Sequence, residues 1–308
     1  MYCNNQQLTV NRKRLTGNEE TKMEWLEKMN AALDYIENNL SGEIDYVEAA
    51  RRACISSYNF QRMFSFIADV PLAEYIRRRR LTLAALDFQK GGGSVLDISL
   101  KYGYDSPVSF ARAFQNLHGI TPKDAREQGA VLTLYPRISF KITIKGVDEM
   151  KYRIEKMKKL RLLGIEKTIS TVNGENFKEI PKMWNEVAED GRLTRLSDKA
   201  KKGKPEGYGV CYNSRGTDFN YMIGVESEEK PEEGMTELII EEQEYVKFEC
   251  RGKLPESQQS VWKRIYTEWF PSSGYEHVEA PELEWYSCEE MDSTTYLSEI
   301  WIPIRKCK

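Results

Sequence analysis

One pattern of apolar residues occurs twice in the first half of this chain, fifty residues apart, and it restricts the folds that the chain can adopt. In the segments 56–67 (SSYNFQRMFSFI) and 106–117 (SPVSFARAFQNL), apolar residues fall at positions i, i+3, i+4 and i+7. These apolar residues are Phe60, Met63, Phe64, Ile67, Phe110, Ala113, Phe114 and Leu117. The spacing predicts two α-helices that each bury one face, and the serine that begins each segment suits a helix N-cap.

A small residue stands at the same distance before each of these helices. Ala49 lies seven residues before Ser56, and Ser99 lies seven residues before Ser106. Two short helices cross closely where a small side chain lies at the crossing, so each segment is expected to follow a second, shorter helix. The sequence therefore predicts two helix-turn-helix units over residues 45–126, in a first half that is entirely helical.

The residues that face away from the two buried stripes carry side chains that can recognise DNA bases. They are Tyr58, Gln61 and Arg62 on the first helix and Val108, Ser109 and Arg112 on the second. Arginine can bridge O6 and N7 of guanine, glutamine can pair with adenine, and valine can contact the methyl group of thymine. Each of these residues alone is compatible with an ordinary solvated position. The matched pair of helices favours double-stranded DNA, such as a promoter operator, as the partner.

The segment between the two units is expected to be one helix that sets their separation. Residues 72–91 (LAEYIRRRRLTLAALDFQKG) would span about 28 Å as a helix. This length is close to the ~34 Å between successive major-groove faces, so one chain can place both reading helices on one side of a duplex. The four arginines at 77–80 fall in this connector, where some can reach phosphates and others must pair with carboxylates.

Composition sets the limits within which these predictions have to hold. A chain of 308 residues is long enough for two domains, and a net charge of −3 means that any basic surface is local. Six cysteines are scattered without a C-x-x-C pair and only two histidines are present, so we expect no metal, no cofactor and a reducing cytoplasm. No apolar run reaches the ~18 residues of a membrane-spanning helix and no signal-peptide pattern is seen, so no membrane association is expected.

A change of pattern near residues 129–137 divides the chain. We predict a mobile tail over 1–22, a helical domain over 23–128, a linker with a first strand (138–145) over 129–147, and an α+β domain over 148–308. The α+β domain is expected to contain two rounds of strand, helix, strand and strand. The expected elements are 152–154, 160–165, 177–188, 207–213 and 219–226 in the first round, and 244–250, 257–270, 283–287 and 296–304 in the second.

Polar and aromatic residues alternate with aliphatic ones near the end of the chain. Side chains alternate along a strand, so Glu284 and Tyr286 share one face of their strand, and Glu299 and Trp301 share one face of the last strand. If the aliphatic residues of the last strand pack beneath the helices, two carboxylates and two aromatic rings meet on the uncovered face. Such a site suits a hydrophobic cation. The alternative is that both glutamates face solvent.

The helical half also carries the motifs of a known family. The motifs A-x6-S-x3-F-x-R-x-F, P-L-x-E-Y-I-x3-R-L and Y-G-Y-D-S-x3-F-x-R-x-F-x5-G-I-T-P make residues 24–128 resemble the AraC/XylS-type DNA-binding domain. The resemblance implies base contacts from the six residues named above. Two positions depart from the family pattern: Ser99 replaces the usual alanine, and Pro107 opens the second reading helix, where proline is tolerated.

The second half resembles the GyrI-like effector-binding domain over residues 148–308. The resemblance rests on F-x-C-x-G-x-L-P-E (248–256), E-W-x-P-S-S-G-Y (268–275), P-E-L-E-W-Y (281–286) and Y-L-S-E-I-W-I-P-I (296–304). It implies two strand-helix-strand-strand units in a pseudo-twofold arrangement with a ligand groove between them. The implied pocket residues are Glu284 with Tyr286, and aromatic walls from Trp184, Tyr208, Tyr221 and Trp301.

These patterns favour a transcription regulator that responds to a small molecule and is not an enzyme. Its expected partners are double-stranded DNA, a small hydrophobic or cationic effector, and RNA polymerase. One alternative is a hydrolase, as some GyrI-like proteins resemble, in which Glu284 and Tyr286 activate a water. Another is an inhibitor of a topoisomerase. Fusion to a DNA-binding half favours sensing over both alternatives.

Overall fold

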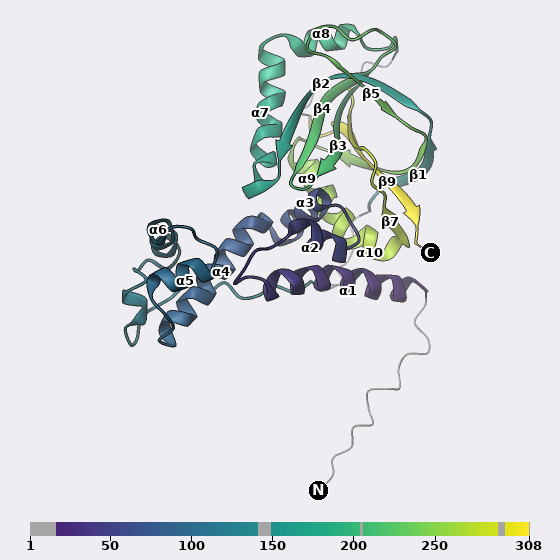
Figure 1. Cartoon of the computed structure of the whole chain (residues 1–308). Helices are drawn as coiled ribbons and strands as arrows, with labels where there is room; N and C mark the ends of the chain where they lie inside the picture. Colours follow the sequence, from purple (N-terminus) through teal and green to yellow (C-terminus); the bar gives the residue numbers. More distant parts are fainter. Residues whose placement is uncertain (1–16, 141–148, 204–205, 289–292, 308) are drawn as a thin grey trace.

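The computed structural model describes residues 17–140, 149–203, 206–288 and 293–307. Helices make up the N-terminal half and a curved sheet with helices makes up the C-terminal half, as Figure 1 shows. The N-terminal helices are α1 (Gly17–Asn38), α2 (Tyr46–Arg52), α3 (Ser57–Ala68), α4 (Leu72–Gln89), α5 (Val95–Lys101) and α6 (Pro107–His118). The predicted fold class, a double helix-turn-helix domain followed by an α+β domain, is confirmed.

The N-terminal boundary of the first helix differs from the prediction. α1 begins at Gly17, so residues 17–22, which were predicted to belong to a mobile tail, are helical. Apolar periodicity finds only the part of a helix that buries a face. Residues 17–22 (GNEETK) contain no large apolar side chain, so this pattern could not extend the predicted helix to them.

The two reading helices begin and end as their sequences dictate. The Ser56 hydroxyl accepts a hydrogen bond from the backbone N–H of Asn59 at 3.2 Å, and the Ser106 hydroxyl accepts one from Ser109 at 3.5 Å. At the other end, Asp69 (φ 53°) and Gly119 (φ 77°) adopt the left-handed conformation that stops a helix. The predicted N-caps of α3 and α6 are therefore confirmed.

Helix α4 contributes to two separate hydrophobic cores. Its first part packs with α1, α2 and α3, through Leu72, Tyr75 and Ile76. Its second part packs with α5 and α6, through Leu81, Ala84, Ala85 and Phe88. The small residues predicted at the helix crossings, Ala49 and Ser99, are both fully buried. The connector is thus a helix, as predicted, and each end of it belongs to one helix-turn-helix unit.

The C-terminal half is built on an antiparallel sheet with the order β1-β6-β9-β8-β3-β4-β2-β5, and β7 pairs with β9. The strands are β1 (Tyr152–Met157), β2 (Leu160–Ser170), β3 (Gly207–Arg215), β4 (Asp218–Glu226), β5 (Thr236–Ile240), β6 (Gln243–Arg251), β7 (Tyr275–His277), β8 (Glu282–Tyr286) and β9 (Leu297–Lys306). The helices are α7 (Asn176–Glu189), α8 (Arg192–Asp198), α9 (Glu256–Arg264) and α10 (Phe270–Ser273), with the π-helical turn η3 (Ile265–Trp269) joining the last two.

The sheet order shows the internal repeat. β2, β4 and β3 form one half and β6, β9 and β8 form the other, so the two halves meet where β3 pairs with β8. In each half the helix follows the outer strand, α7 after β2 and α9 after β6. The cavity described below lies at this junction.

The strand predicted over residues 138–145 is not seen in its described part. Residues 138–140 form no strand, and 141–148 lie outside the described residues. The Phe140 backbone N–H donates instead to the side-chain oxygen of Asn30 on α1 at 3.0 Å, and the Phe140 ring packs 6.2 Å from Phe64. None of the helices in the described ranges is long and apolar enough to cross a membrane.

Candidate functional site

A cavity of about 370 Å³ lies between α7 and α9, above the junction of the two half-sheets. Four of the six residues predicted for an effector pocket line it: Trp184, Tyr221, Glu284 and Tyr286. Gly209 on β3 leaves room for the two tyrosines, because a Cβ atom at this position would collide with the Tyr221 hydroxyl. The sheet thus supplies an aromatic floor that contains one carboxylate.

Glu284 is held at the centre of this floor by several donors. Its Oε1 accepts hydrogen bonds from the Trp262 indole at 3.0 Å and from the Arg62 guanidinium at 3.0 Å, and its Oε2 accepts one from the Tyr286 hydroxyl at 2.9 Å. Burial, reinforced by the charge of Glu284, raises the pKa of Tyr286 well above its ordinary value, so this phenol stays a donor. With its oxygens held by these donors, Glu284 is better placed to attract a cation than to act as a base on a water molecule.

The other two predicted pocket residues, Tyr208 and Trp301, do not line this cavity. They pack against each other at a centroid distance of 5.7 Å in a core on the opposite face of the sheet. In the register of β8 and β9, Leu283 lies opposite Trp301 and therefore shares its face. The prediction that Trp301 and Glu284 share a face is wrong for this reason.

The same register corrects the predicted position of Glu299. Glu284 lies opposite Ile300, whereas Glu299 lies opposite Trp285. Glu299 accepts hydrogen bonds from Arg153 at 2.8 and 3.0 Å on the face away from the cavity. The two carboxylates therefore do not converge, and the cavity carboxylate lies on the aliphatic, helix-covered face.

Helix α3 of the first helix-turn-helix unit closes one side of the cavity. The Arg62 guanidinium lies 3.7 Å from the centroid of the Trp262 ring, 2.8 Å from Glu282 Oε2 and 3.0 Å from Glu284 Oε1. The Tyr58 hydroxyl lies 3.1 Å from Cys211 Sγ, and its ring lies 4.2 Å from that of Phe219. A second domain of the same chain thus contributes side chains to the cavity.

This docking corrects the expectation that the outer face of α3 is accessible. Tyr58, Gln61 and Arg62 retain only 4%, 5% and 7% of their surface. Helix α3 buries one face in its own unit and the other against the C-terminal domain. The second face carries polar side chains, so the apolar periodicity does not mark it as buried. On α6 the three predicted reading residues are exposed, with Val108 at 63%. Figure 1 shows α6 at the end of the helical half that is remote from the sheet.

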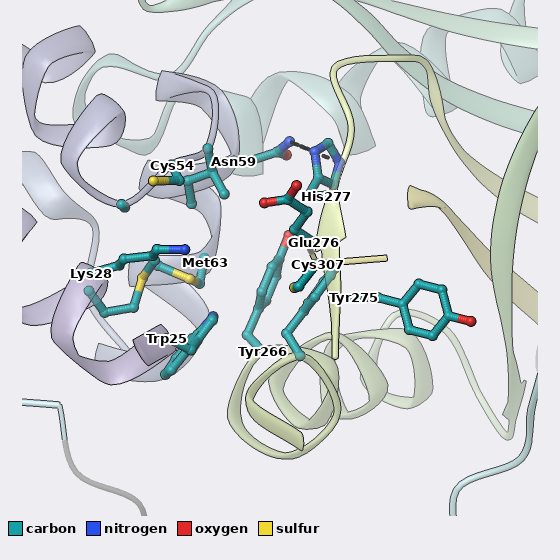
Figure 2. A pocket seen from close by; sticks show the side chains of 14 residues that line it. Trp25, Lys28, Cys54, Asn59, Met63, Tyr266, Tyr275, Glu276, His277 and Cys307 are labelled. Carbon is teal, nitrogen blue, oxygen red and sulfur yellow. Dashed lines mark hydrogen bonds between the residues drawn. The ribbon is translucent and has the colours of Figure 1, made fainter. Parts of the chain in front are cut away.

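A polar network joins α3 to the carboxylates of β8. Figure 2 shows Asn59 of α3 pointing at the ring of His277, which lies 3.1 Å away. The same ring lies 2.7 Å from Glu282. Burial raises the pKa of Glu282, but the hydrogen bond and charge of His277 and the charge of Arg62 outweigh it and hold this pKa below the ordinary value. Glu282 is therefore an ionised partner for Arg62.

Aromatic residues from both halves surround this network. In Figure 2, Trp25 and Met63 from the helical half face Tyr266 from the C-terminal half across a small cavity of about 60 Å³. Sequence reasoning missed Glu282, His277 and Trp262. Glu282 had a usable signal, because it stands two residues before Glu284 and so shares its face of β8.

The four arginines of the connector all have partners within the chain. Arg77 and Arg78 pair with Glu74, and Arg80 donates to backbone carbonyl groups. Arg79 forms a buried ion pair with Glu37 at 2.8 Å. Arg77 and Arg78 keep 41% and 35% of their side-chain surface, so both can still face phosphates.

The chain joins two helix-turn-helix units to a domain whose cavity holds a carboxylate among aromatic rings. This combination is typical of proteins that couple DNA binding to small-molecule binding. Comparison with known proteins gives the family. Residues 150–305, half of the chain, match the GyrI-like small molecule binding domain, and the protein belongs to this family. Residues 49–128 match a helix-turn-helix domain, so the chain is an AraC-type transcription regulator with a C-terminal GyrI-like domain. Both resemblances drawn from the sequence are confirmed.

Individual relatives match parts of the chain. It is 41% identical over 90 residues to the HTH-type transcriptional activator AarP of Providencia stuartii, and the matched segment covers 29% of this chain and 67% of AarP. It is 38% identical over 116 residues to YkgA of Escherichia coli (strain K12), which covers 38% of this chain and 47% of YkgA, so the chain spans about half of that relative. The solved structure of SAV2435 bound to tetraphenylphosphonium is similar with a TM-score of 0.46 and 23% identity, over 51% of this chain and 94% of that one.

Proposed function

We propose that this protein is a ligand-responsive transcription regulator that reads an asymmetric promoter site with α3 and α6. Its effector is a small hydrophobic or cationic molecule that binds between α7 and α9, and it acts with RNA polymerase in the cytoplasm. The observation that carries the proposal is Glu284, a carboxylate held among Trp184, Tyr221, Tyr286 and Trp262 in a cavity. Ion pairing and cation–π attraction both favour a cation in such a cavity.

Arg112 is proposed as a base-reading residue because it is exposed on the outer face of α6. We expect Arg112→Ala to lose ~1–3 kcal/mol of binding free energy on a duplex selected by the wild-type chain, and much less on random DNA. Fluorescence anisotropy at one fixed salt concentration measures both affinities. Arg195→Ala is the matched control, since Arg195 is an exposed arginine of α8 and its removal changes net charge equally. An equal loss on selected and random DNA would exclude base reading by Arg112.

Glu284 is proposed as the group that selects cations. We expect Glu284→Gln to reduce the preference for phenylguanidinium over its neutral isostere phenylurea by about tenfold or more, because a charge-assisted contact contributes ~1.5–3 kcal/mol. Isothermal titration of the full chain with both compounds gives this ratio. Glu299→Gln removes the carboxylate on the opposite face of the sheet and should leave the preference unchanged. A preference that survives Glu284→Gln would contradict the proposed role.

A further inference from the structure

The cation position of the cavity is already occupied by a side chain of the DNA-reading helix. The guanidinium of Arg62 lies over the Trp262 ring at 3.7 Å and contacts both Glu282 and Glu284 within 3.0 Å. An aromatic face with carboxylates beside it is the arrangement that recognises an organic cation. Arg62 is 7% exposed and lies deep enough to fill this position rather than to cover its entrance.

We propose that α3 is an internal ligand of the cavity: Arg62 and a cationic effector compete for one position, and effector binding releases the first reading helix for DNA. This inference rests on the proposed function and adds the chemical class of the effector and the way in which it acts. The effector is an organic monovalent cation whose charge is spread over a planar group, as it is in the guanidinium that it replaces.

Docking of α3 and base reading by α3 exclude each other. Tyr58, Gln61 and Arg62 keep at most 7% of their surface in the docked chain, so none of them can reach a base edge in a major groove. Helix α6 is exposed in the same structure. The docked chain therefore presents one reading helix and the released chain presents two.

The charge balance of the cavity explains why the displacing ligand must be a cation. Glu282 and Glu284 have side-chain exposures of 4% and 19%, and the single positive charge of Arg62 lies within 3.0 Å of both carboxylates. A buried ion pair has a small net value, because desolvation offsets its attraction, but removing one partner is strongly unfavourable. A cation that replaces Arg62 keeps the carboxylates paired. A neutral molecule of the same shape would remove the guanidinium charge from beside both carboxylates and supply no charge in its place.

Other contacts of docked α3 join the two halves as well. Phe66 stacks on Trp262 at 6.2 Å, Asn59 contacts His277, and Asp69 forms an exposed ion pair with Lys263 at 2.8 Å. The buried Tyr58 ring lies 4.2 Å from that of Phe219. Release of α3 breaks these contacts too, so docking and release form an equilibrium. A ligand shifts such an equilibrium only by the difference between its affinities for the two states. Competition for the position of Arg62 supplies this difference directly, since the effector binds only where α3 has withdrawn its side chain.

The first arm of the test measures competition in the full chain. Isothermal titration compares the binding of phenylguanidinium to the wild type, to Arg62→Ala and to Arg195→Ala. We expect Arg62→Ala to bind it about tenfold or more tightly than the wild type, because an occupied position reduces the apparent affinity. Arg195→Ala should bind as the wild type does. Binding without a gain in Arg62→Ala overturns this inference alone, whereas no binding by any variant overturns the cation cavity of the proposed function as well.

The second arm measures release on DNA. Duplexes are selected from a random pool by the full-length wild type and by the double variant Glu282→Gln/Glu284→Gln, which leaves Arg62 without its carboxylates. We expect the double variant to select two half-sites and to bind them about tenfold or more tightly than the wild type does. Phenylguanidinium should shift the wild type in the same direction and leave the double variant unchanged. Equal affinities and identical selected sites for the two proteins overturn the inference while leaving DNA reading intact.

A milder variant tests the same release if the double variant fails to fold. Lys263→Glu places a negative charge opposite Asp69 at the edge of the docked interface, outside both the cavity and the reading face. It should increase DNA affinity in the same direction by a smaller factor. Lys202→Glu makes the same charge change at an exposed turn and should have no effect. Indistinguishable DNA affinities for Lys263→Glu and Lys202→Glu count against release of α3.

Discussion

Replacing Trp262 by alanine is expected to lower the free energy of unfolding by about 3–5 kcal/mol, the range for truncation of a large buried aromatic residue. Trp262 is 2% exposed and packs between Phe66 of α3 and Tyr266 of the following turn. Its indole N–H also holds Glu284, and its ring lies under Arg62. Denaturant unfolding of the purified chain measures the loss, and the preference for phenylguanidinium over phenylurea should fall in the same variant.

Trp262→Phe separates the two roles of this residue. It keeps an aromatic face but removes the N–H donor to Glu284, so we expect most of the stability to remain while Glu284 loses one of its hydrogen bonds. Both variants can be followed by the same unfolding experiment. A cost below about 1 kcal/mol for Trp262→Ala would show that the site collapses around the missing ring and that Trp262 does not join the two halves.

The second large effect is expected at Arg79 in the connector helix. Arg79→Ala should cost about 3–5 kcal/mol of stability, because it leaves Glu37 buried without a partner charge. The side chains of Arg79 and Glu37 are 10% and 6% exposed, and Arg79 also donates to the backbone oxygen of Tyr135 at 2.7 Å. Thermal or denaturant unfolding measures the loss. This result would assign Arg79 to the scaffold rather than to phosphate contacts.

Its neighbour in the arginine run provides the control. Arg78 pairs with Glu74 on the surface, with a side-chain exposure of 35%, so Arg78→Ala should change stability by less than about 1 kcal/mol. The double variant Glu37→Ala/Arg79→Ala should recover part of the loss, since neither charge is then left unpaired. Equal losses of unfolding free energy for Arg78→Ala and Arg79→Ala would show that burial of the Arg79–Glu37 pair does not increase its contribution to stability.

Local patterns were sufficient to predict the helical half. The serine caps at Ser56 and Ser106, the apolar stripes behind them and the small residues at the crossings all act over a few residues, and the structure has each of them. The docking of Arg62 was beyond this reasoning. A side chain on the outer face of an amphipathic helix looks the same in sequence whether water, DNA or another domain covers it.

Strand alternation predicted part of the cavity and misplaced the rest. Glu284 and Tyr286 lie on one strand, so alternation alone places them together. Trp301 lies on the next strand, and its face depends on which residue it pairs with. A register shift of one residue moves every side chain to the other face, and nothing within either strand fixes that register. The pairing of Trp301 with Leu283, rather than with Glu284, was therefore not available from the sequence.

Helix α4 packs into two hydrophobic cores and thereby aligns the two reading helices with each other. Each residue of an α-helix advances the chain by about 1.5 Å and turns it by about 100°. One residue inserted between Ile76 and Leu81 would rotate one half of α4 out of its core, because both halves are packed. The angular phase between α3 and α6 is thus fixed by the same apolar contacts that stabilise the fold. If the half-sites of an operator were moved apart by one base pair, the protein could not follow by lengthening this helix, and the two reading helices would no longer match both half-sites.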